Sequence, residues 1–236
     1  MKTPVKGIAR NGLLLYNRRI EGGFNMADIL VLANSKKNGG FCVAGKDIVS
    51  NSWVRLVGDQ NGAELNLNQI TYNDLAGRRQ MIQYEPFNKF IRLNFGNVAP
   101  LCYQPENMLI GQGLWQEIQV TQHNINYDTP IDLWGASDRI KADDIKQNLI
   151  NVQQSLYLIQ VTDLEFYIND FNAHRAHFQY GCSTYDLGAT MDPSIFQDIV
   201  NGVRGHNNIL TVSLAGPFFN RYSNQYEHYK LVAAVF

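Results

Sequence analysis

From Met26 onward, the chain is divided into short apolar segments of strand length, each followed by a polar turn. The first segment, residues 29–33, is a continuous apolar run typical of a buried strand. A second strand is predicted at residues 41–48, after a polar loop that ends in glycine, and a third at residues 53–57. Short strands at this spacing favour a β-barrel or a β-sandwich over alternating βαβ units.

The same pattern continues through most of the remaining sequence. Further strands are predicted at residues 80–87, 89–95, 156–162, 165–168, 173–180, 184–189, 209–214 and 228–235. A short helix is predicted from Pro193 to about Asn201, with Asp192 as its N-cap. Each half of the chain therefore has about five short strands with a helix nearby, which are the elements of an OB-fold, a small Greek-key barrel.

Residues 128–155 interrupt the β-pattern. Ser137 can cap a helix with a single apolar stripe, which comprises Ile140, Ile145, Leu149 and Val152. Between Asp128 and Asp170 there are eight acidic residues against three basic ones, so this joint is a poor phosphate contact.

We therefore predict an all-β fold with a few short helices, built from two tandem OB-fold-like barrels packed together. The first barrel is expected at residues 26–136, a connecting helix at 137–155, and the second barrel at 156–236.

Residues 1–25 differ from the rest because they are basic and lack clear periodicity. Codons for Glu21-Gly22-Gly23 can spell a bacterial ribosome-binding site at a suitable distance from Met26. Two interpretations remain open: a leader ahead of a natural start at Met26, or a flexible N-terminal tail.

The composition excludes several classes of function. The formal net charge is −1 and charged residues make up 17% of the chain, so any phosphate contact must come from a local patch. Three widely spaced cysteines, Cys42, Cys102 and Cys182, match neither a disulfide framework nor paired zinc spacing, so we expect reduced thiols in a cytoplasmic protein. No apolar run approaches the ~20 residues of a transmembrane helix, and no membrane partner is expected.

Two motifs suggest catalysis or metal binding but lack the necessary chemistry. Residues 40–47 match the spacing of a phosphate-binding P-loop, yet Asp47 occupies the position of the required hydroxyl and would repel phosphates. His174 and His177 lie three apart on a predicted strand, so their rings point to opposite faces, and no ligand set lies nearby. We expect no enzymatic activity, no cofactor and no metal site.

The first half offers the better candidate for a binding surface. Between Lys36 and Arg92 the chain has eight basic and five acidic residues. Trp53 and Arg55 share one strand face, with Lys36 and Lys37 in the preceding loop, so together they could form an aromatic platform with a basic rim for single-stranded nucleic acid. In the alternative, Trp53 belongs to the core and Arg55 pairs with a buried carboxylate such as Glu64.

A second polar cluster follows a proline-bearing loop. Gln104, Glu106 and Asn107 could read base edges or could fix the loop internally. Lys230, in an otherwise apolar strand, points outward or meets a partner in the joint. The complete predicted contact set is Asn34, Ser35, Lys36, Lys37, Trp53, Arg55, Arg78, Gln104, Glu106, Asn107 and Lys230.

Five motifs in order resemble one known family. Residues 30–45 combine an apolar strand, Ala-Asn-Ser, a basic pair, Gly-Gly and a cysteine-containing strand ending in Ala-Gly. The others are Trp53-Val54-Arg55, Gln104-Pro105-Glu106-Asn107 with Leu109-Ile110, the segment 210–218 with Gly216-Pro217-Phe218, and residues 229–234. Together they resemble the dual OB-containing domain of prokaryotes, from about residue 27 to 236. Lys36 and Lys37 stand where arginine is common, which keeps the charge but weakens bidentate contacts.

The resemblance implies two OB-folds and a non-catalytic, nucleic-acid-binding accessory protein of a prokaryotic antiviral defence or mobile-element system. The partner would be DNA or RNA, with a single strand as one option, or a protein effector of such a system. Two alternatives remain: a protein-interaction adaptor, and a sensor of nucleotides or other small molecules. Fold alone does not establish function.

Overall fold

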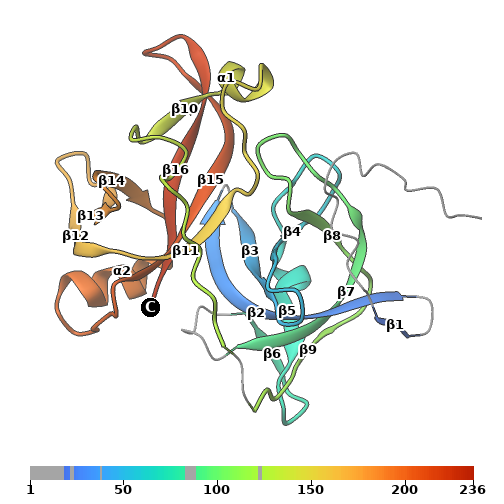
Figure 1. The fold of residues 1–236 in the computed structure, drawn as a ribbon. Helices are drawn as coiled ribbons and strands as arrows, with labels where there is room; N and C mark the ends of the chain where they lie inside the picture. The colour runs from blue at the N-terminus through green and yellow to red at the C-terminus, as the bar shows by residue number, and fades with distance from the viewer. Residues whose placement is uncertain (1–18, 22–23, 38, 83–88, 122–123) are drawn as a thin grey trace, which may run out of the picture.

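Two β-barrels lie side by side in the computed structural model, which describes residues 19–21, 24–37, 39–82, 89–121 and 124–236; the side chains of 19–25 and 37 are outside the description. In Figure 1, the first barrel is drawn from blue to green and the second from yellow to red. Helices are few and short, so the predicted all-β fold with two small barrels is confirmed.

Five strands close the first barrel. They are β2 (Phe24–Lys37), β3 (Gly40–Asp47), β4 (Trp53–Val57), β7 (Phe90–Val98) and β8 (Asn107–Ile110). The hydrogen-bonded order is β2-β3-β4-β8-β7 and back to β2, with only β4 and β8 parallel among these pairs. This ring of five strands is the Greek-key arrangement of an OB-fold.

The long strand β2 is bent so that it can pair with β3 along one part and β7 along another. Its register against β3 shifts between Val31 and Ala33, which is a β-bulge. Gly45 lies opposite this bulge, and a Cβ atom there would collide with the carbonyl oxygen of Leu30. The Ala-Gly ending of the first motif therefore has a steric reason.

Alternating side chains fill the first barrel. Along β7, Ile91, Leu93 and Phe95 are buried while their neighbours are partly exposed. A small extension, attached through β9, lies outside the ring: η1 (Leu67–Ile70), β5 (Thr71–Asn73), β6 (Arg79–Met81) and β9 (Trp115–Glu117). The strand predicted at 80–87 is described only in part, because residues 83–88 lie outside the described residues.

The second barrel is closed by one bent strand that is counted as two. Strand β11 (Leu156–Gln160) pairs with β15, while β12 (Thr162–Ile168) pairs with β13, and only Val161 separates them. The remaining strands are β13 (His174–Tyr180), β14 (Ser183–Ala189), β15 (Ile209–Asn220) and β16 (Gln225–Val235). The order β11-β15-β16-β14-β13-β12 therefore returns to the strand on which it began.

The two barrels share a plan. In each, the third and fifth strands pair in parallel, β4 with β8 and β14 with β16. Helix α2 (Pro193–Val200) lies between the third and fourth strands of the second barrel and is capped by Asp192, whose carboxylate accepts the Ser194 N–H at 2.8 Å. This predicted helix and its cap are confirmed.

The helix predicted at residues 137–155 is wrong. Instead, β10 (Arg139–Lys141) pairs with β16, and α1 (Ala142–Lys146) is a single short helix whose N-cap is Lys141 rather than Ser137. Leu149 is exposed, so the expected apolar stripe does not exist. The pairing of β10 with β16, which is distant in the sequence, therefore prevails over the local apolar spacing that predicted a helix.

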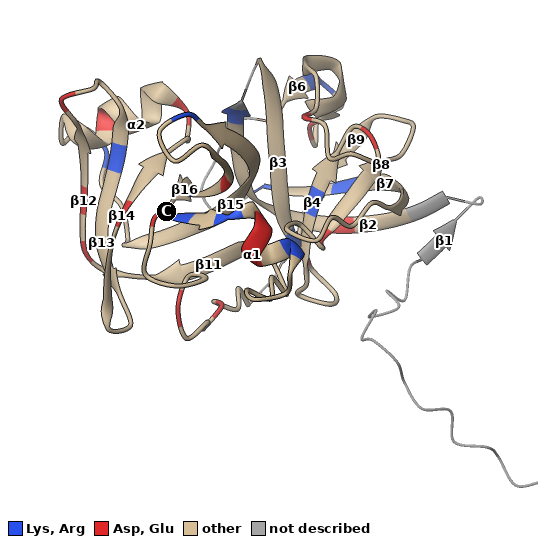
Figure 2. Ribbon diagram, turned by 90° about the horizontal axis from the view of Figure 1, so that it is seen from above, with Lys and Arg blue, Asp and Glu red and all other residues tan. Residues whose placement is uncertain are grey.

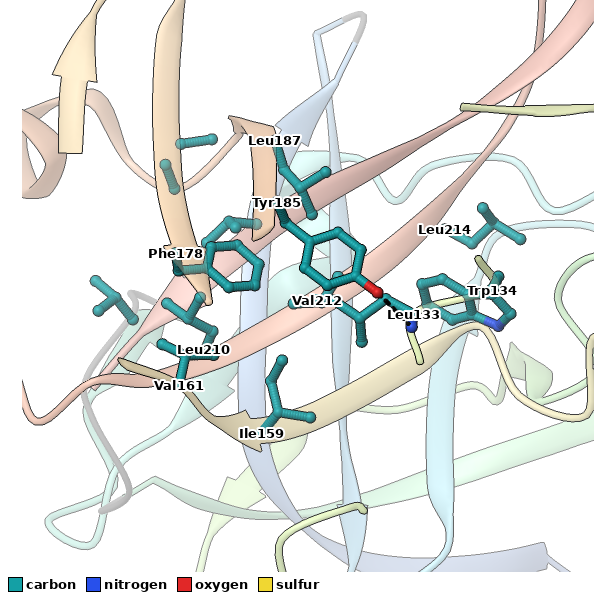
Figure 3. Packing of buried hydrophobic residues seen from close by; sticks show 14 of the residues in the cluster. Leu133, Trp134, Ile159, Val161, Phe178, Tyr185, Leu187, Leu210, Val212 and Leu214 are labelled. Atoms are coloured by element: carbon teal, nitrogen blue, oxygen red, sulfur yellow. Dashed lines mark hydrogen bonds between the residues drawn. The ribbon is translucent and has the colours of Figure 1, made fainter. Parts of the chain in front are cut away.

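The hydrophobic core of the second barrel includes residues that precede residue 137 in the sequence. Leu133 and Trp134 pack there beside Tyr185, whose hydroxyl accepts the Leu133 N–H at 3.2 Å (Figure 3). At the other end, β1 (Arg19–Glu21) pairs with β2. The two interpretations of residues 1–25 remain untested, since 1–18 and 22–23 lie outside the described residues.

Candidate functional site

The second barrel covers the outer face of β2, β3 and β4. All five residues of β4 are buried, because Val54 and Leu56 point into the first barrel while Trp53 points toward the second. The apolar part of this seam comprises Leu30, Leu32, Ala33, Ala44, Trp53, Leu156, Leu158, Ile209, Ala233, Ala234 and Phe236. An OB-fold commonly binds its ligand on the face of its second and third strands, and in the first barrel that face is occupied.

Arg55 forms a buried polar network across the seam. Its Nε lies 3.3 Å from Oε1 of Glu106, and its Nη2 donates to the hydroxyls of Ser155 at 2.9 Å and Ser213 at 3.1 Å. Glu106 also accepts the hydroxyl and the backbone N–H of Ser155, the latter at 3.1 Å. The alternative that Arg55 pairs with a buried carboxylate is confirmed. The carboxylate is that of Glu106, whereas Glu64 was the example expected from the sequence.

A second polar cluster is centred on Asp128. One carboxylate oxygen accepts from Nζ of Lys46 at 3.0 Å, and the other accepts from Nε1 of Trp53 at 2.8 Å and from the Leu158 N–H at 2.7 Å. Lys46 also donates to the carbonyl of Asn126 at 2.6 Å. The lysine of the P-loop-like segment is thus buried in the seam. The acidic joint that contains Asp128 was visible in the sequence, but its partners 75 and 82 residues away were not.

Gln104 and Asn107 fix the loop between β7 and β8. Nε2 of Gln104 donates to the Leu214 carbonyl of the second barrel at 3.2 Å, and Nδ2 of Asn107 lies 3.4 Å from Oε1 of Gln104. Both side chains are buried. The loop-fixing alternative describes this cluster.

Lys230 is buried in the second barrel. Its Nζ donates to the carbonyl of Gly135 at 2.6 Å and lies 5.8 Å from the centre of the Tyr185 ring. Burial lowers the pKa of Lys230 to about 8, although the charges of Asp132 and Asp138 oppose this shift. The sequence left two orientations open for Lys230, outward or toward a partner in the joint. The second is observed, and the partner is Gly135.

The stability of the protein should rise with pH because of Lys230. Between about pH 8 and the ordinary lysine pKa of 10.5, the unfolded chain binds a proton that the folded chain has released, so the free energy of unfolding increases by roughly 2–3 kcal/mol. The variant Lys230→Met should lack this increase. Urea denaturation of both proteins across this pH range measures it, and parallel curves would contradict the assignment.

The remaining predicted contacts do not gather into one groove. Lys36 is exposed, with its Nζ 5.8 Å from the centre of the Phe41 ring, while Asn34 donates to the Ile82 carbonyl at 2.5 Å and Ser35 is buried. The side chain of Lys37 lies outside the described residues. Arg78 is exposed but pairs with Asp74 at 2.8 Å, on the small extension of the first barrel.

The aromatic and basic groove proposed on the first barrel is therefore wrong as an exposed surface. Trp53 and Arg55 are only 4% and 7% exposed, and Gln104, Glu106, Asn107 and Lys230 are likewise enclosed. The physical reason is that the outer face of β4 is the contact with the second barrel. In Figure 2, the segments coloured for basic and acidic residues are interspersed along the described backbone of both barrels.

An exposed aromatic surface lies instead on the hairpin of β15 and β16, which extends beyond the second barrel (Figure 1). Phe219 and Tyr226 face each other across the hairpin with ring centres 5.4 Å apart, and Tyr222 at the turn is fully exposed beside Arg221. We call these four residues the hairpin tip. Phe219 and Tyr222 belong to an aromatic-rich stretch of the sequence, but their position beyond the barrel depends on the fold.

The turn of the hairpin is held by a buried carboxylate. Glu227 accepts from Asn220 at 2.7 Å, Ser223 at 2.7 Å and Gln225 at 3.0 Å. Burial alone would raise the pKa of Glu227, but these hydrogen bonds and the charge of Arg139 lower it to about 2. The carboxylate is therefore ionised at neutral pH, and it gives the hairpin a defined shape.

A small apolar pocket lies at the base of the hairpin, where both barrels meet. It has a volume of about 200 Å³ and is lined by Cys102, Tyr103, Ala142, Lys146, Pro217, Tyr226 and His228. The rings of Tyr103 and His228 are in contact, with centres 4.7 Å apart. Burial and the charge of Lys146 lower the pKa of His228 although its hydrogen bond to Ala215 opposes the shift, so the ring is neutral at pH 7 and its Nδ1–H donates to that carbonyl at 2.8 Å.

No helix in the described part of the chain is long and apolar enough to cross a membrane. Among the described residues, no group of three or more histidine, cysteine or acidic side chains is arranged to hold a metal ion. His174 instead stacks on Phe196 with ring centres 4.0 Å apart.

The fold and the seam define a protein of two OB-like barrels joined through a polar and apolar interface. The chain belongs to the dual OB-containing domain family, whose model matches residues 27–235. No curated protein matches the sequence. Among solved structures, the tetrameric p202 HIN2 aligns with 91% of this chain and 95% of its own, at 10% identity and a TM-score of 0.26, which is too low to support an argument.

Proposed function

We propose that this protein is a non-catalytic, nucleic-acid-binding accessory of a prokaryotic defence or mobile-element system, and that it contacts its ligand through the hairpin tip. The observation that carries the proposal is the exposure of Phe219, Tyr222 and Tyr226 on a hairpin of defined shape. In an OB-fold, the loop between the fourth and fifth strands is one of the two loops that bind oligonucleotides, and this hairpin contains that loop.

Stacking rather than charge should supply most of the affinity. Successive bases of a single strand stack on aromatic side chains with about 1–3 kcal/mol per base, independent of sequence. The overall charge of −1 and the single basic residue at the tip, Arg221, predict few phosphate contacts. The dependence of affinity on salt should then be shallow, with a slope for about one to three phosphates.

The test is a binding assay with single- and double-stranded DNA and RNA, from about 50 to about 200 mM salt. We expect binding of single strands, and a loss of about tenfold or more for the double variant Phe219→Ala/Tyr222→Ala, which changes two exposed aromatic residues of the hairpin tip. Tyr127→Ala is the control, because Tyr127 is also an exposed tyrosine but lies in the segment between β9 and β10, outside both ligand-binding loops of the second barrel. Absence of binding at low salt would overturn the proposal.

A protein-interaction adaptor is the second candidate. It is favoured by further exposed apolar side chains, Ile131 and Phe171, and by the near-neutral charge. Aromatic residues are also enriched where proteins bind one another. Failure to bind any nucleic acid, together with capture of an effector encoded beside this gene that is lost in the hairpin variant, would favour this function.

A further inference from the structure

We infer that the pocket at the base of the hairpin holds one nucleobase, with Lys146 at its rim contacting the phosphate attached to that nucleotide. The inference deepens the proposed function and rests on it for the source of the base. It adds a specific site to a surface that would otherwise only stack bases on its outside.

The residues that line the pocket are suited to a flat aromatic ring. Tyr103, Pro217, Tyr226 and His228 supply ring and pyrrolidine surfaces, and the exposed lining is almost entirely apolar. The neutral state of His228 removes a charge that would otherwise be desolvated by a bound base. Aromatic and apolar walls of this kind hold splayed-out bases in proteins that bind single strands.

The size of the pocket limits the ligand to a single base. Sites for drug-sized ligands enclose about 300–1,000 Å³, whereas this one encloses about 200 Å³. The sugar and phosphate must therefore remain outside. Since few polar atoms line the pocket, it should discriminate weakly among bases.

Lys146 is placed to contact a phosphate at the rim. Its side chain is largely exposed, and its Nζ lies 3.6 Å from a carboxylate oxygen of Asp143, which is also exposed. An exposed pair of this kind is weak, so the ammonium group can turn from Asp143 to a phosphate. The carboxylates of the acidic joint oppose this contact, so we expect it to contribute only a small part of the affinity.

Both barrels are needed to form the pocket. Cys102 and Tyr103 belong to the loop between β7 and β8 of the first barrel, whereas Pro217, Tyr226 and His228 belong to the second. A further cavity of about 250 Å³ shares Tyr103 and Pro217 and continues along the seam. The docking of the barrels thus creates a binding site even though it covers the face of β4.

Cys102 provides a local probe, because it is an exposed free thiol on the pocket wall. Cys182, also exposed and free, lies at the turn between β13 and β14 and is the internal control. The full-length protein is labelled with a maleimide, alone or with saturating thymidine 5′-monophosphate or a short oligothymidylate, and the rate at each cysteine is measured by mass spectrometry. We expect either ligand to slow labelling of Cys102 about tenfold and to leave Cys182 unchanged.

Two variants connect this protection to the pocket. Tyr226→Ala should weaken binding of both ligands about tenfold, and Lys146→Gln should weaken it several-fold while lowering the salt slope by about one. Tyr127→Ala, which replaces an exposed tyrosine outside the pocket, should leave protection unchanged.

The outcomes separate the pocket from the proposed function. If the oligothymidylate binds but Cys102 is not protected, the proposal that the pocket holds a base is overturned, and the proposal that the hairpin tip binds nucleic acid is retained. If only the monophosphate binds and protects Cys102, the pocket stands as a nucleotide site and the nucleic-acid proposal is overturned. If neither ligand binds, both are overturned.

Discussion

Replacing Asp128 with alanine is expected to lower the free energy of unfolding by about 3–5 kcal/mol, because it leaves a buried lysine without its carboxylate. Lys46 is 2% exposed and has few other partners, and the substitution also removes the acceptor of the Trp53 indole and of the Leu158 N–H. Each buried donor left without an acceptor adds a further penalty. Urea denaturation followed by tryptophan fluorescence measures the change.

Asp143→Ala is the matched control for this prediction. Asp143 also pairs with a lysine, Lys146, but both side chains are exposed, so the loss should stay within about 0.5 kcal/mol. The double variant Lys46→Met/Asp128→Asn removes the unpaired charge and should recover at least half of the lost stability. Equal effects of Asp128→Ala and Asp143→Ala would show that the seam is not closed in solution.

Replacing Arg55 with alanine should have an effect of similar size, about 3–5 kcal/mol, for a related reason. The buried carboxylate of Glu106 would keep its bonds to Ser155 but lose the guanidinium group with which it pairs, and the hydroxyl of Ser213 would lose a donor. Thermal or urea unfolding measures the loss. The double variant Arg55→Met/Glu106→Gln should recover a large part of it.

This prediction also distinguishes stability from binding. Arg78→Ala, which breaks an exposed pair with Asp74, is the control and should change the free energy of unfolding by less than about 1 kcal/mol. If Arg55 were instead a nucleic-acid contact, its replacement would weaken binding and leave the unfolding curve unchanged. That result would contradict the seam described above.

The strands were largely predictable because their signal is local. The alternation of Trp53, Val54 and Arg55 correctly placed Trp53 and Arg55 on the outer face of the first barrel. What covers an outer face is decided by a second structural unit, and no periodicity within one strand carries that information. For this reason the same pattern that located β4 also suggested an exposed platform.

The identity of partners that are distant in the sequence was the second feature that could not be predicted. Glu64 and Glu106 are both plausible carboxylates for Arg55, and only the fold brings Glu106 to within 3.3 Å. The segment around Ile140 has a helical apolar pattern, yet β10 forms there because β16 offers an edge with which to pair. The pocket at the base of the hairpin draws on both barrels and on α1, so no single stretch of sequence could have indicated it.

The shared seam has a consequence for synthesis on the ribosome. All five strands of the first barrel have been made once β8 has emerged, but Ser213, whose hydroxyl accepts a hydrogen bond from Arg55, follows roughly 100 residues later. At the usual rate of translation this delay is about 5–20 s, during which Trp53, Lys46 and Arg55 face water or the chaperones of the cell. The nascent first barrel therefore exposes a surface that the complete protein buries, and the charged groups of Lys46 and Arg55 let water solvate part of it until the second barrel is made.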